Sequence, residues 1–242
     1  YGQPYLRRAA RANQRADALI SYVNELKARI MAASAGDYDE AGELNYSAFI
    51  GKDENGMDTV LNLKHVPIKD EYQNLTTYVG LAEPATPLEG EWTAVDLRTK
   101  MSSYAEYLRN ISVTDNLGLR RELPETIKAQ IDETFAFPTE IVEDREVSWE
   151  QANFYHVPLA AVMPLMTKMT LDVQDIQEDI LSWLLGSVDA KSYKFTNLLP
   201  LVVPESNYIL RGDSFRADVL LAAFDGTNPP DIFVENKKWN GR

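Results

Sequence analysis

The sequence contains no cysteine, and this absence excludes disulfide bonds, thiolate catalysis and cysteine-based zinc sites together. Histidine is nearly absent as well, with His65 and His156 as the only two. Neither histidine has a second histidine or an acid at the spacing of a helical metal-ligand pair. We therefore expect both to be structural. The sequence nominates no catalytic residue, and we expect no metal and no cofactor.

Long apolar runs and common catalytic motifs are also missing. No apolar run is long enough to cross a membrane, and no signal-peptide pattern opens the chain. The sequence begins at Tyr1 rather than at a methionine, so we expect a processed product or an excised piece of a longer protein. The G-x-S-x-G, phosphate-loop and dinucleotide-loop patterns do not occur. We therefore predict that the protein is not an enzyme.

Acidic residues outnumber basic ones by 37 to 24, which gives a formal net charge of −13. This sign argues against a nucleic-acid partner. The first 33 residues have the opposite sign of charge: six bases and two acids give a balance of +4. Four of these bases form a row at helical spacing and are candidate interaction residues: Arg7, Arg8, Arg11 and Arg15. The row is a solvated face, or it pairs with the acidic middle of the chain, or it is a docking surface for another protein.

Apolar residues at three- and four-residue spacing predict helices over residues 4–33, 92–111 and, as one or two helices, 115–135. Gly36 is a suitable stop for the first helix. Its predicted apolar stripe consists of Leu6, Ala9, Ala16, Leu19, Val23, Leu26 and Ile30. Residues 37–91 show no lasting pattern and are predicted to be an irregular loop, of the kind that is often functional.

The strongest periodicity follows Ser148, where Ser-Trp-Glu-Gln forms a capping-box pattern. It predicts a last long helix over 159–186 with the stripe Leu159, Val162, Met166, Met169, Val173, Ile176, Ile180 and Trp183. We hypothesise that this stripe packs inside the protomer's own bundle; a dimer seam is the alternative. Five of its members are candidate coupling residues: Met166, Val173, Ile176, Ile180 and Trp183.

Beyond residue 188 the period changes to alternation, which predicts at most four β-strands. The expected fold class is therefore α+β and multidomain. Residues 1–188 would form a helical bundle domain, and residues 189–242 the start of an immunoglobulin-like β-sandwich domain, cut off before its sheets are complete.

Two groups of acids are weaker candidates for chemistry. Residues 53–58, DENGMD, faintly resemble a calcium loop, but Gly56 stands two positions too early and a plain turn is the expectation. Four acids lie at close helical spacing and could in principle serve a carboxylate hydrolase: Asp172, Asp175, Glu178 and Asp179. They lie opposite the apolar stripe, where a run of charges usually forms a solvated face.

Residues 211–213 spell Arg-Gly-Asp, a tripeptide of cell-adhesion ligands. Alternating residues flank it on both sides, so Gly212 and Asp213 are predicted to form the structural turn of a hairpin. An adhesin-like or ligand-binding module without catalysis remains the alternative function, supported by this tripeptide and the long loop.

The C-terminal part also carries a specific pattern. Residues 194–197 read KFTN, residues 203–225 read VPESNYILRGDSFRADVLLAAFD, and residues 227–232 read TNPPDI. This pattern resembles the GldM/PorM family of gliding-motility and type IX secretion proteins, whose version runs K-A-x-S-N-Y-V-L-x-G-D-x-[FY]-x-A-D-[IV]-F-[LV]-A-A-x-D. Residues 11–30 are similar to the helix ahead of the family's periplasmic bundle.

The resemblance implies a periplasmic homodimer that is anchored in the inner membrane by an N-terminal transmembrane helix. This sequence lacks that helix and most of the family's later β-domains, so we expect it to be the N-terminal periplasmic fragment. The implied partners are a GldL/PorL-type inner-membrane motor protein, reached through the missing helix, and outer-membrane-associated GldK/GldN-type or PorK/PorN-type proteins, reached through the missing domains.

The implied function is structural. The shaft would couple a proton-driven motor of the inner membrane to partners at the outer membrane, for protein secretion and for gliding motility. Residues 159–186 would then be the rigid coupling element between bundle and β-domain.

Overall fold

The computed structural model describes residues 3–52, 58–60, 69–114, 118, 120–192, 197–204, 216–224, 233–234 and 237–238. The chain divides into two compact units, Tyr1–Leu185 and Gly186–Arg242. Each unit is described by itself below.

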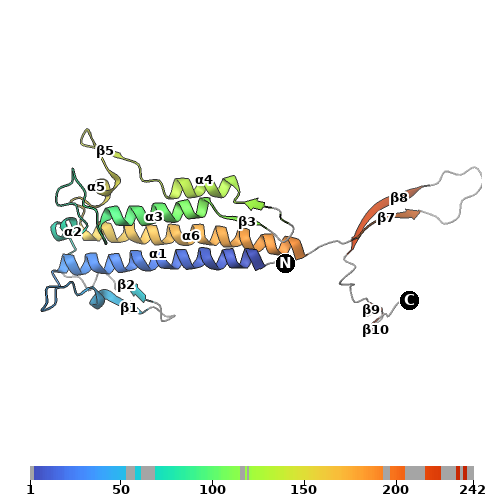
Figure 1. Ribbon diagram of the computed structural model, residues 1–242, viewed down its shortest axis with the longest axis horizontal. Helices are drawn as coiled ribbons and strands as arrows, with labels where there is room; N and C mark the ends of the chain where they lie inside the picture. Colours follow the sequence, from blue (N-terminus) through green and yellow to red (C-terminus); the bar gives the residue numbers. More distant parts are fainter. Residues whose placement is uncertain are drawn as a thin grey trace, which may run out of the picture. The chain divides into compact units, whose positions relative to one another are not determined.

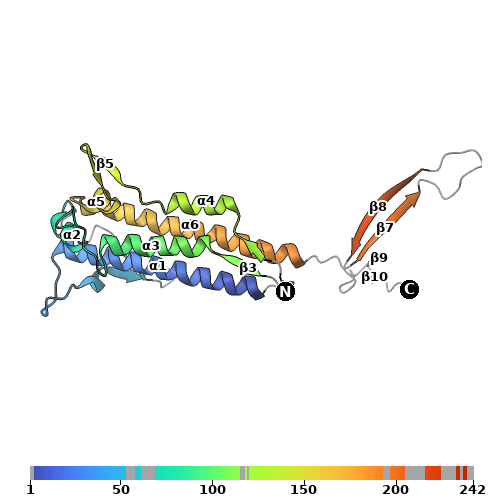
Figure 2. The ribbon, with the colours of Figure 1, turned by 45° about the horizontal axis from the view of Figure 1, so that its top comes forward.

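The first unit is built on four helices: α1 (Gln3–Ala35), α3 (Ala94–Arg109), α4 (Glu125–Thr134) and α6 (Leu159–Ser192). They run alternately in opposite directions (Figures 1 and 2). Side-chain contacts fix the antiparallel pairing of α1 and α6, because Asn13 is hydrogen-bonded to Gln177 whereas Lys27, further along α1, donates to the earlier Thr167. The predicted helical bundle is confirmed as the architecture of this unit.

The first helix matches its prediction closely. Gly36 follows its last residue in the left-handed region (φ +67°), and the Gly36 and Asp37 amides donate to carbonyls of the final turn, which ends the helix. One member of the predicted stripe is wrong, because Leu6 is 46% exposed. Tyr5 is buried in its place, since the stripe continues backwards from Ala9 by four residues and not by three.

The middle of the bundle differs more from the prediction. Thr93 caps α3 by accepting a hydrogen bond from the Asp96 amide, so the helix begins two residues later than expected. In the described part of residues 115–135 one helix forms, α4, within the prediction of one or two helices. It is preceded by a short hairpin of β3 (Ser112–Thr114) and β4 (Arg120–Glu122), whose few residues are too short for a periodic signal.

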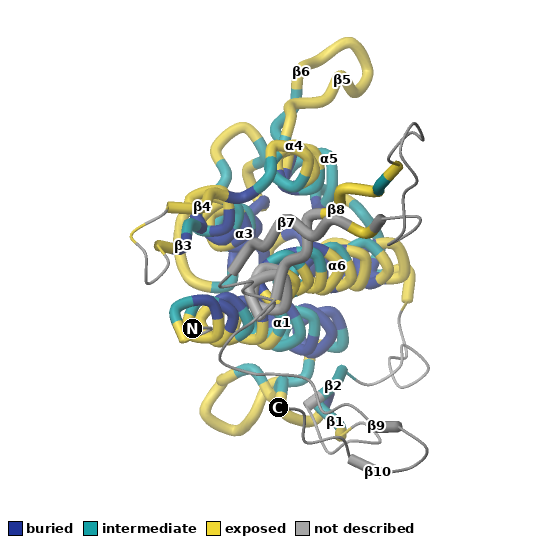
Figure 3. The backbone as a smooth tube through the Cα atoms, turned by 90° about the vertical axis from the view of Figure 1, so that its right-hand side faces the viewer, coloured by how far each residue is buried: buried dark blue, intermediate teal, exposed yellow. Residues whose placement is uncertain are grey.

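The end of the bundle where α1 stops carries the remaining short elements: η1 (Tyr46–Phe49), β1 (Ile50–Lys52), β2 (Asp58–Val60), α2 (Gln73–Tyr78), β5 (Glu140–Val142), β6 (Arg145–Val147) and α5 (Trp149–Phe154). The prediction of an irregular loop over residues 37–91 is therefore wrong in part. Packing against α1 holds η1, β2 and α2, and a periodic pattern cannot reveal such contacts. The β5–β6 hairpin is exposed along nearly its whole length (Figure 3).

The capping box at Ser148 is confirmed, with both of its reciprocal hydrogen bonds to Gln151 present. The helix it opens, α5, is only six residues long. It ends because Tyr155 is extended and His156 is left-handed (φ +54°). The chain then restarts as α6, whose Leu159 and Ala160 amides donate to the carbonyls of Glu71 and Lys69.

The predicted α6 stripe is buried from Leu159 to Ile180 inside a single chain. The prediction of Trp183 as the last member of the stripe is wrong, because this side chain is only partly buried. Leu184, four residues after Ile180, is buried instead. The helix also passes its predicted stop at Gly186 and continues to Ser192. A single glycine costs a helix only about 1 kcal/mol, which neighbouring helical residues can offset.

The second unit contains the predicted strands β7 (Asn197–Pro204) and β8 (Ala217–Phe224), and two short ones, β9 (Phe233–Val234) and β10 (Lys237–Lys238). β7 pairs with β8, and β9 with β10, both antiparallel. The predicted turn at Gly212 and Asp213 lies outside the described residues.

Candidate functional site

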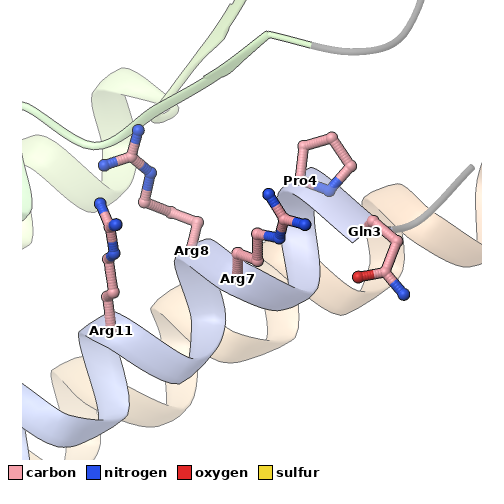
Figure 4. Close-up of a pocket in the computed structure, with 5 residues that line it drawn as sticks. All are labelled: Gln3, Pro4, Arg7, Arg8 and Arg11. Carbon is pink, nitrogen blue, oxygen red and sulfur yellow. The ribbon is translucent and has the colours of Figure 1, made fainter.

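Three of the four predicted arginines gather at the beginning of α1. Gln3, Pro4, Arg7, Arg8 and Arg11 line a hollow of about 460 Å³ on the surface of the helix. Figure 4 shows the three arginine side chains rising from the same side of α1, with the Arg7 head group beside Pro4. The helical spacing of the three residues produces this arrangement, because positions three and four apart share a face.

These arginines carry their charge without a protein counterion. In the described part of the chain, no carboxylate lies within ion-pair distance of Arg7, Arg8 or Arg11. The first turn of α1 contains no acid either. The sequence-based alternative in which this row pairs with the acidic body is therefore not the arrangement found in the first unit.

Arg15 belongs to the predicted row but has a different environment. Its guanidinium carbon lies 4.1 Å from the centre of the Tyr107 ring on α3, which is a cation–π contact. Arg15 therefore helps to fasten α1 to α3 and does not line the hollow. No sequence pattern points to the contact with Tyr107, because the spacing of residues within one helix does not reveal which other helix packs against it.

The β3–β4 hairpin adds further positive charge to this end of the bundle. It contacts α1, and Figures 1 and 2 place β3 at the end where α1 begins. Arg120 on β4 is paired with Glu122 at 3.3 Å, while the neighbouring Arg121 is exposed. Arg121 therefore adds an exposed positive charge near the end of the bundle where α1 begins.

A second group of charged and aromatic side chains lies at the other half of α1, and sequence reasoning missed it. The Arg29 guanidinium lies 3.8 Å from the Tyr46 ring centre and 4.2 Å from that of Trp92, and its Nη2 is 2.6 Å from Glu25 Oε1. Burial lowers the pKa of Arg29, but hydrogen bonds with Glu25 and Tyr78 outweigh burial and raise it overall. This group, the Arg29 cluster, ties α1 to η1, α2 and the start of α3.

Tyr22 extends the Arg29 cluster along α1. Its ring stacks on Trp92 with centres 4.9 Å apart, and its hydroxyl donates to Asp96 at 2.7 Å. Asp96 also accepts from the Trp92 amide and lies 3.4 Å from the Lys100 ammonium. Burial, followed by the bond to Asp96, raises the pKa of Tyr22 well above its ordinary value. Trp92 is held in the left-handed region (φ +66°), a strained conformation that these contacts stabilise.

Four of the five candidate coupling residues of α6 are not available for contacts with another molecule. Met166, Val173, Ile176 and Ile180 are all at most 1% exposed in the single chain. Trp183 is partly exposed. The stripe therefore packs within one protomer's bundle, and any coupling role would be transmitted through the helix.

The acidic candidates of α6 are engaged or solvated. Asp172 pairs with Lys168 at 2.6 Å, and Asp179 accepts a hydrogen bond from Gln130. Asp175 and Glu178 are exposed. Within the described ranges, no group of three or more acids or histidines could hold a metal ion. His156 is stacked on Tyr155, with ring centres 4.1 Å apart, and most of residues 53–58 fall outside the described residues.

The fold places the chain in the class of proteins that join a helical bundle to a β-strand region. Residues 2–187 match the family model described as GldM N-terminal domain, and residues 189–241 match GldM second domain. The chain belongs to the GldM family, and this identifies it as a component of gliding motility or type IX secretion. This is a structural family of motility and secretion and not a known enzyme family. No curated protein shows significant similarity to the chain.

GldM-family proteins are membrane-anchored components of the periplasm. Among the helices of the described residues, none combines the length and the apolar character that crossing a bilayer requires.

Proposed function

We propose that this chain transmits mechanical work across the periplasm, as part of the shaft that drives type IX secretion and gliding. In this role it works as a homodimer. A GldL/PorL-type proton-driven motor protein of the inner membrane supplies the work, and GldK/GldN-type or PorK/PorN-type proteins at the outer membrane receive it. The observation that carries the proposal is family membership over residues 2–241.

The build of α6 supports a mechanical role. A 34-residue helix is a stiff element, and its inner face is fixed by seven large apolar side chains of the stripe, from Leu159 to Ile180. It is also the element that continues from the first unit into the residues of the second, since the units divide between Leu185 and Gly186. We propose that residues 159–186 are the coupling element and that residues 189–242 begin an immunoglobulin-like sandwich.

A pair of insertions between Leu185 and Gly186 tests the proposal in the full-length protein. One insert is a heptad of glycine and serine, which is flexible, and the other is a heptad of alanine, glutamate and lysine, which continues the helix with its face nearly unchanged. Transmission through α6 predicts that the flexible insert abolishes secretion and gliding at normal protein levels, while the helical insert retains both.

The adhesin-like alternative predicts a different result. A ligand-binding module would tolerate both inserts equally, because each unit keeps its own fold. Equal activity of the two insertion variants would therefore contradict force transmission through α6.

A further inference from the structure

We propose that the hollow lined by Arg7, Arg8 and Arg11 is a binding site for a phosphate group. The site is independent of the force-transmitting role. It rests on three observations: three guanidinium groups from one helix face line one hollow, the hollow measures about 460 Å³, and no described carboxylate pairs with any of the three.

The three arginines of the hollow have no described carboxylate partner, as is also the case for Arg15, Lys27 and Arg121, but they are the ones that line a common hollow. Seven other cationic side chains of the first unit lie within ion-pair distance of a carboxylate: Arg29, Arg98, Lys100, Arg109, Arg120, Lys128 and Lys168. The chain has an excess of 13 acids from which partners could be drawn. Three neighbouring arginines on one helix face repel each other weakly, and an anion bound among them would relieve this repulsion.

The chemistry of the lining selects phosphate among anions. A guanidinium group is a planar fork of donors that binds two oxygens of a phosphate at once. A phosphate offers three or more oxygens and up to two negative charges, which three forks can share, whereas a carboxylate offers two oxygens and one charge.

Two sources could present this group: a free phosphate compound or the headgroup of an anionic lipid. Both share the same chemistry at the arginines. Leu6, exposed beside Arg7, would add to lipid binding, since apolar and basic side chains together favour a membrane surface. The experiment therefore has one arm for each source.

The first arm titrates the 242-residue chain with inorganic pyrophosphate at low ionic strength by calorimetry. We expect saturable binding that weakens as salt is added, because the site is open to solvent. The Arg8→Gln/Arg11→Gln variant should bind at least about ten-fold more weakly per arginine removed. Arg11→Gln alone removes one charge, and its matched control is Arg15→Gln, which removes one charge from the same helix outside the hollow and should bind as the unchanged chain does.

The second arm measures flotation of the same chains with phosphatidylcholine vesicles that contain or lack phosphatidylglycerol. Binding that needs phosphatidylglycerol and is lost in Arg8→Gln/Arg11→Gln, but not in Arg15→Gln, identifies the lipid as the source. An Arg8→Lys/Arg11→Lys variant keeps the charge but not the fork, and should bind with intermediate strength.

Two results would overturn the proposal. One is that neither pyrophosphate nor the anionic vesicles bind. The other is that Arg8→Gln/Arg11→Gln and Arg15→Gln weaken binding equally. That result would mean that anions are attracted to the positive charge of the helix in general and not to the hollow. Because the three arginines are at the surface, circular dichroism should show unchanged helix content in every variant, so a loss of binding reports on the site.

Discussion

The two halves of α1 belong to one continuous helix but are held in different ways. The first half buries mostly small residues: Tyr5, Ala9, Ala12 and Ala16. The second half buries small residues too, Ala28, Ala32, Ala33 and Ser34, but adds five large ones: Leu19, Val23, Leu26, Ile30 and Met31. The arginines differ in the same way, since those of the hollow have no protein counterion while Arg29 is surrounded by Glu25, Tyr46 and Trp92.

The half of α1 that contributes most to the core and the half whose arginines are open to solvent are therefore different parts of one helix. Burial of large apolar side chains contributes about 1.5–3 kcal/mol for each residue, whereas alanine contributes much less. The second half of α1 should therefore be the more stable part, and the first half should open more readily. The arginines of the hollow lie on the half that contributes less to the core.

The largest contrast is expected between two leucines of α1. Leu26 is fully buried, so Leu26→Ala removes apolar contacts and leaves a cavity; we expect a loss of about 3 kcal/mol in the free energy of unfolding. Leu6→Ala, on the exposed side of the first half, should change it by less than about 0.5 kcal/mol. Urea unfolding of both variants measures the difference, and similar losses would show that the two halves contribute equally.

A smaller contrast is expected between arginines. Arg29→Ala removes two cation–π contacts and a half-buried ion pair, and should cost about 2 kcal/mol of unfolding free energy. Arg29→Lys restores the charge but not the planar stacking, and should recover only part of the loss. Arg11→Ala is the matched change in the first half and should be nearly neutral in the same urea unfolding assay. A cost at Arg11 equal to that at Arg29 would mean that the hollow is part of the structural core.

How well the sequence predicts each element depends on how far apart in the sequence its interacting residues lie. The long helices and the Gly36 stop are local signals, so they were predicted well. The strands β1 to β6 are three residues each and carry no period, so the pattern could not show them.

The candidate residues follow the same division. The arginine row was predicted because its members are neighbours on one helix. The Arg29 cluster was missed because Tyr46, Tyr78 and Trp92 come from three distant segments that meet only in the folded chain. The exposure of Leu6 and Trp183 at the two ends of predicted stripes shows that periodicity fixes a helix face less well at its ends.

The smallest contrast concerns pH and the Tyr22 hydroxyl of the Arg29 cluster. Tyr22→Phe removes the hydrogen bond to Asp96 and should cost about 1.5 kcal/mol of unfolding free energy at neutral pH. The pKa of Tyr22 is raised in the folded chain, and its ordinary value is 10.0. Above pH 10 the unfolded chain therefore loses this proton while the folded chain keeps it, so the stability supplied by Tyr22 falls as the pH rises.

Tyr22→Phe has no hydroxyl proton to lose, so its stability does not fall in this way. Its deficit in unfolding free energy against the unchanged chain should therefore shrink by up to about 1 kcal/mol between pH 9 and about pH 11. The partial solvent exposure of the ring reduces the size of this effect. Tyr104→Phe is the control for burial alone. The pKa of Tyr104 is raised mainly by burial, and its hydroxyl has no hydrogen-bond partner in the described part of the chain. This variant should lose almost nothing at neutral pH, yet become relatively more stable than the unchanged chain in alkali. Urea midpoints over this pH range measure both differences. A constant deficit for Tyr22→Phe would mean that Asp96 does not hold the tyrosine proton, and that the Arg29 cluster fastens α1 by ring stacking and the arginine contacts alone.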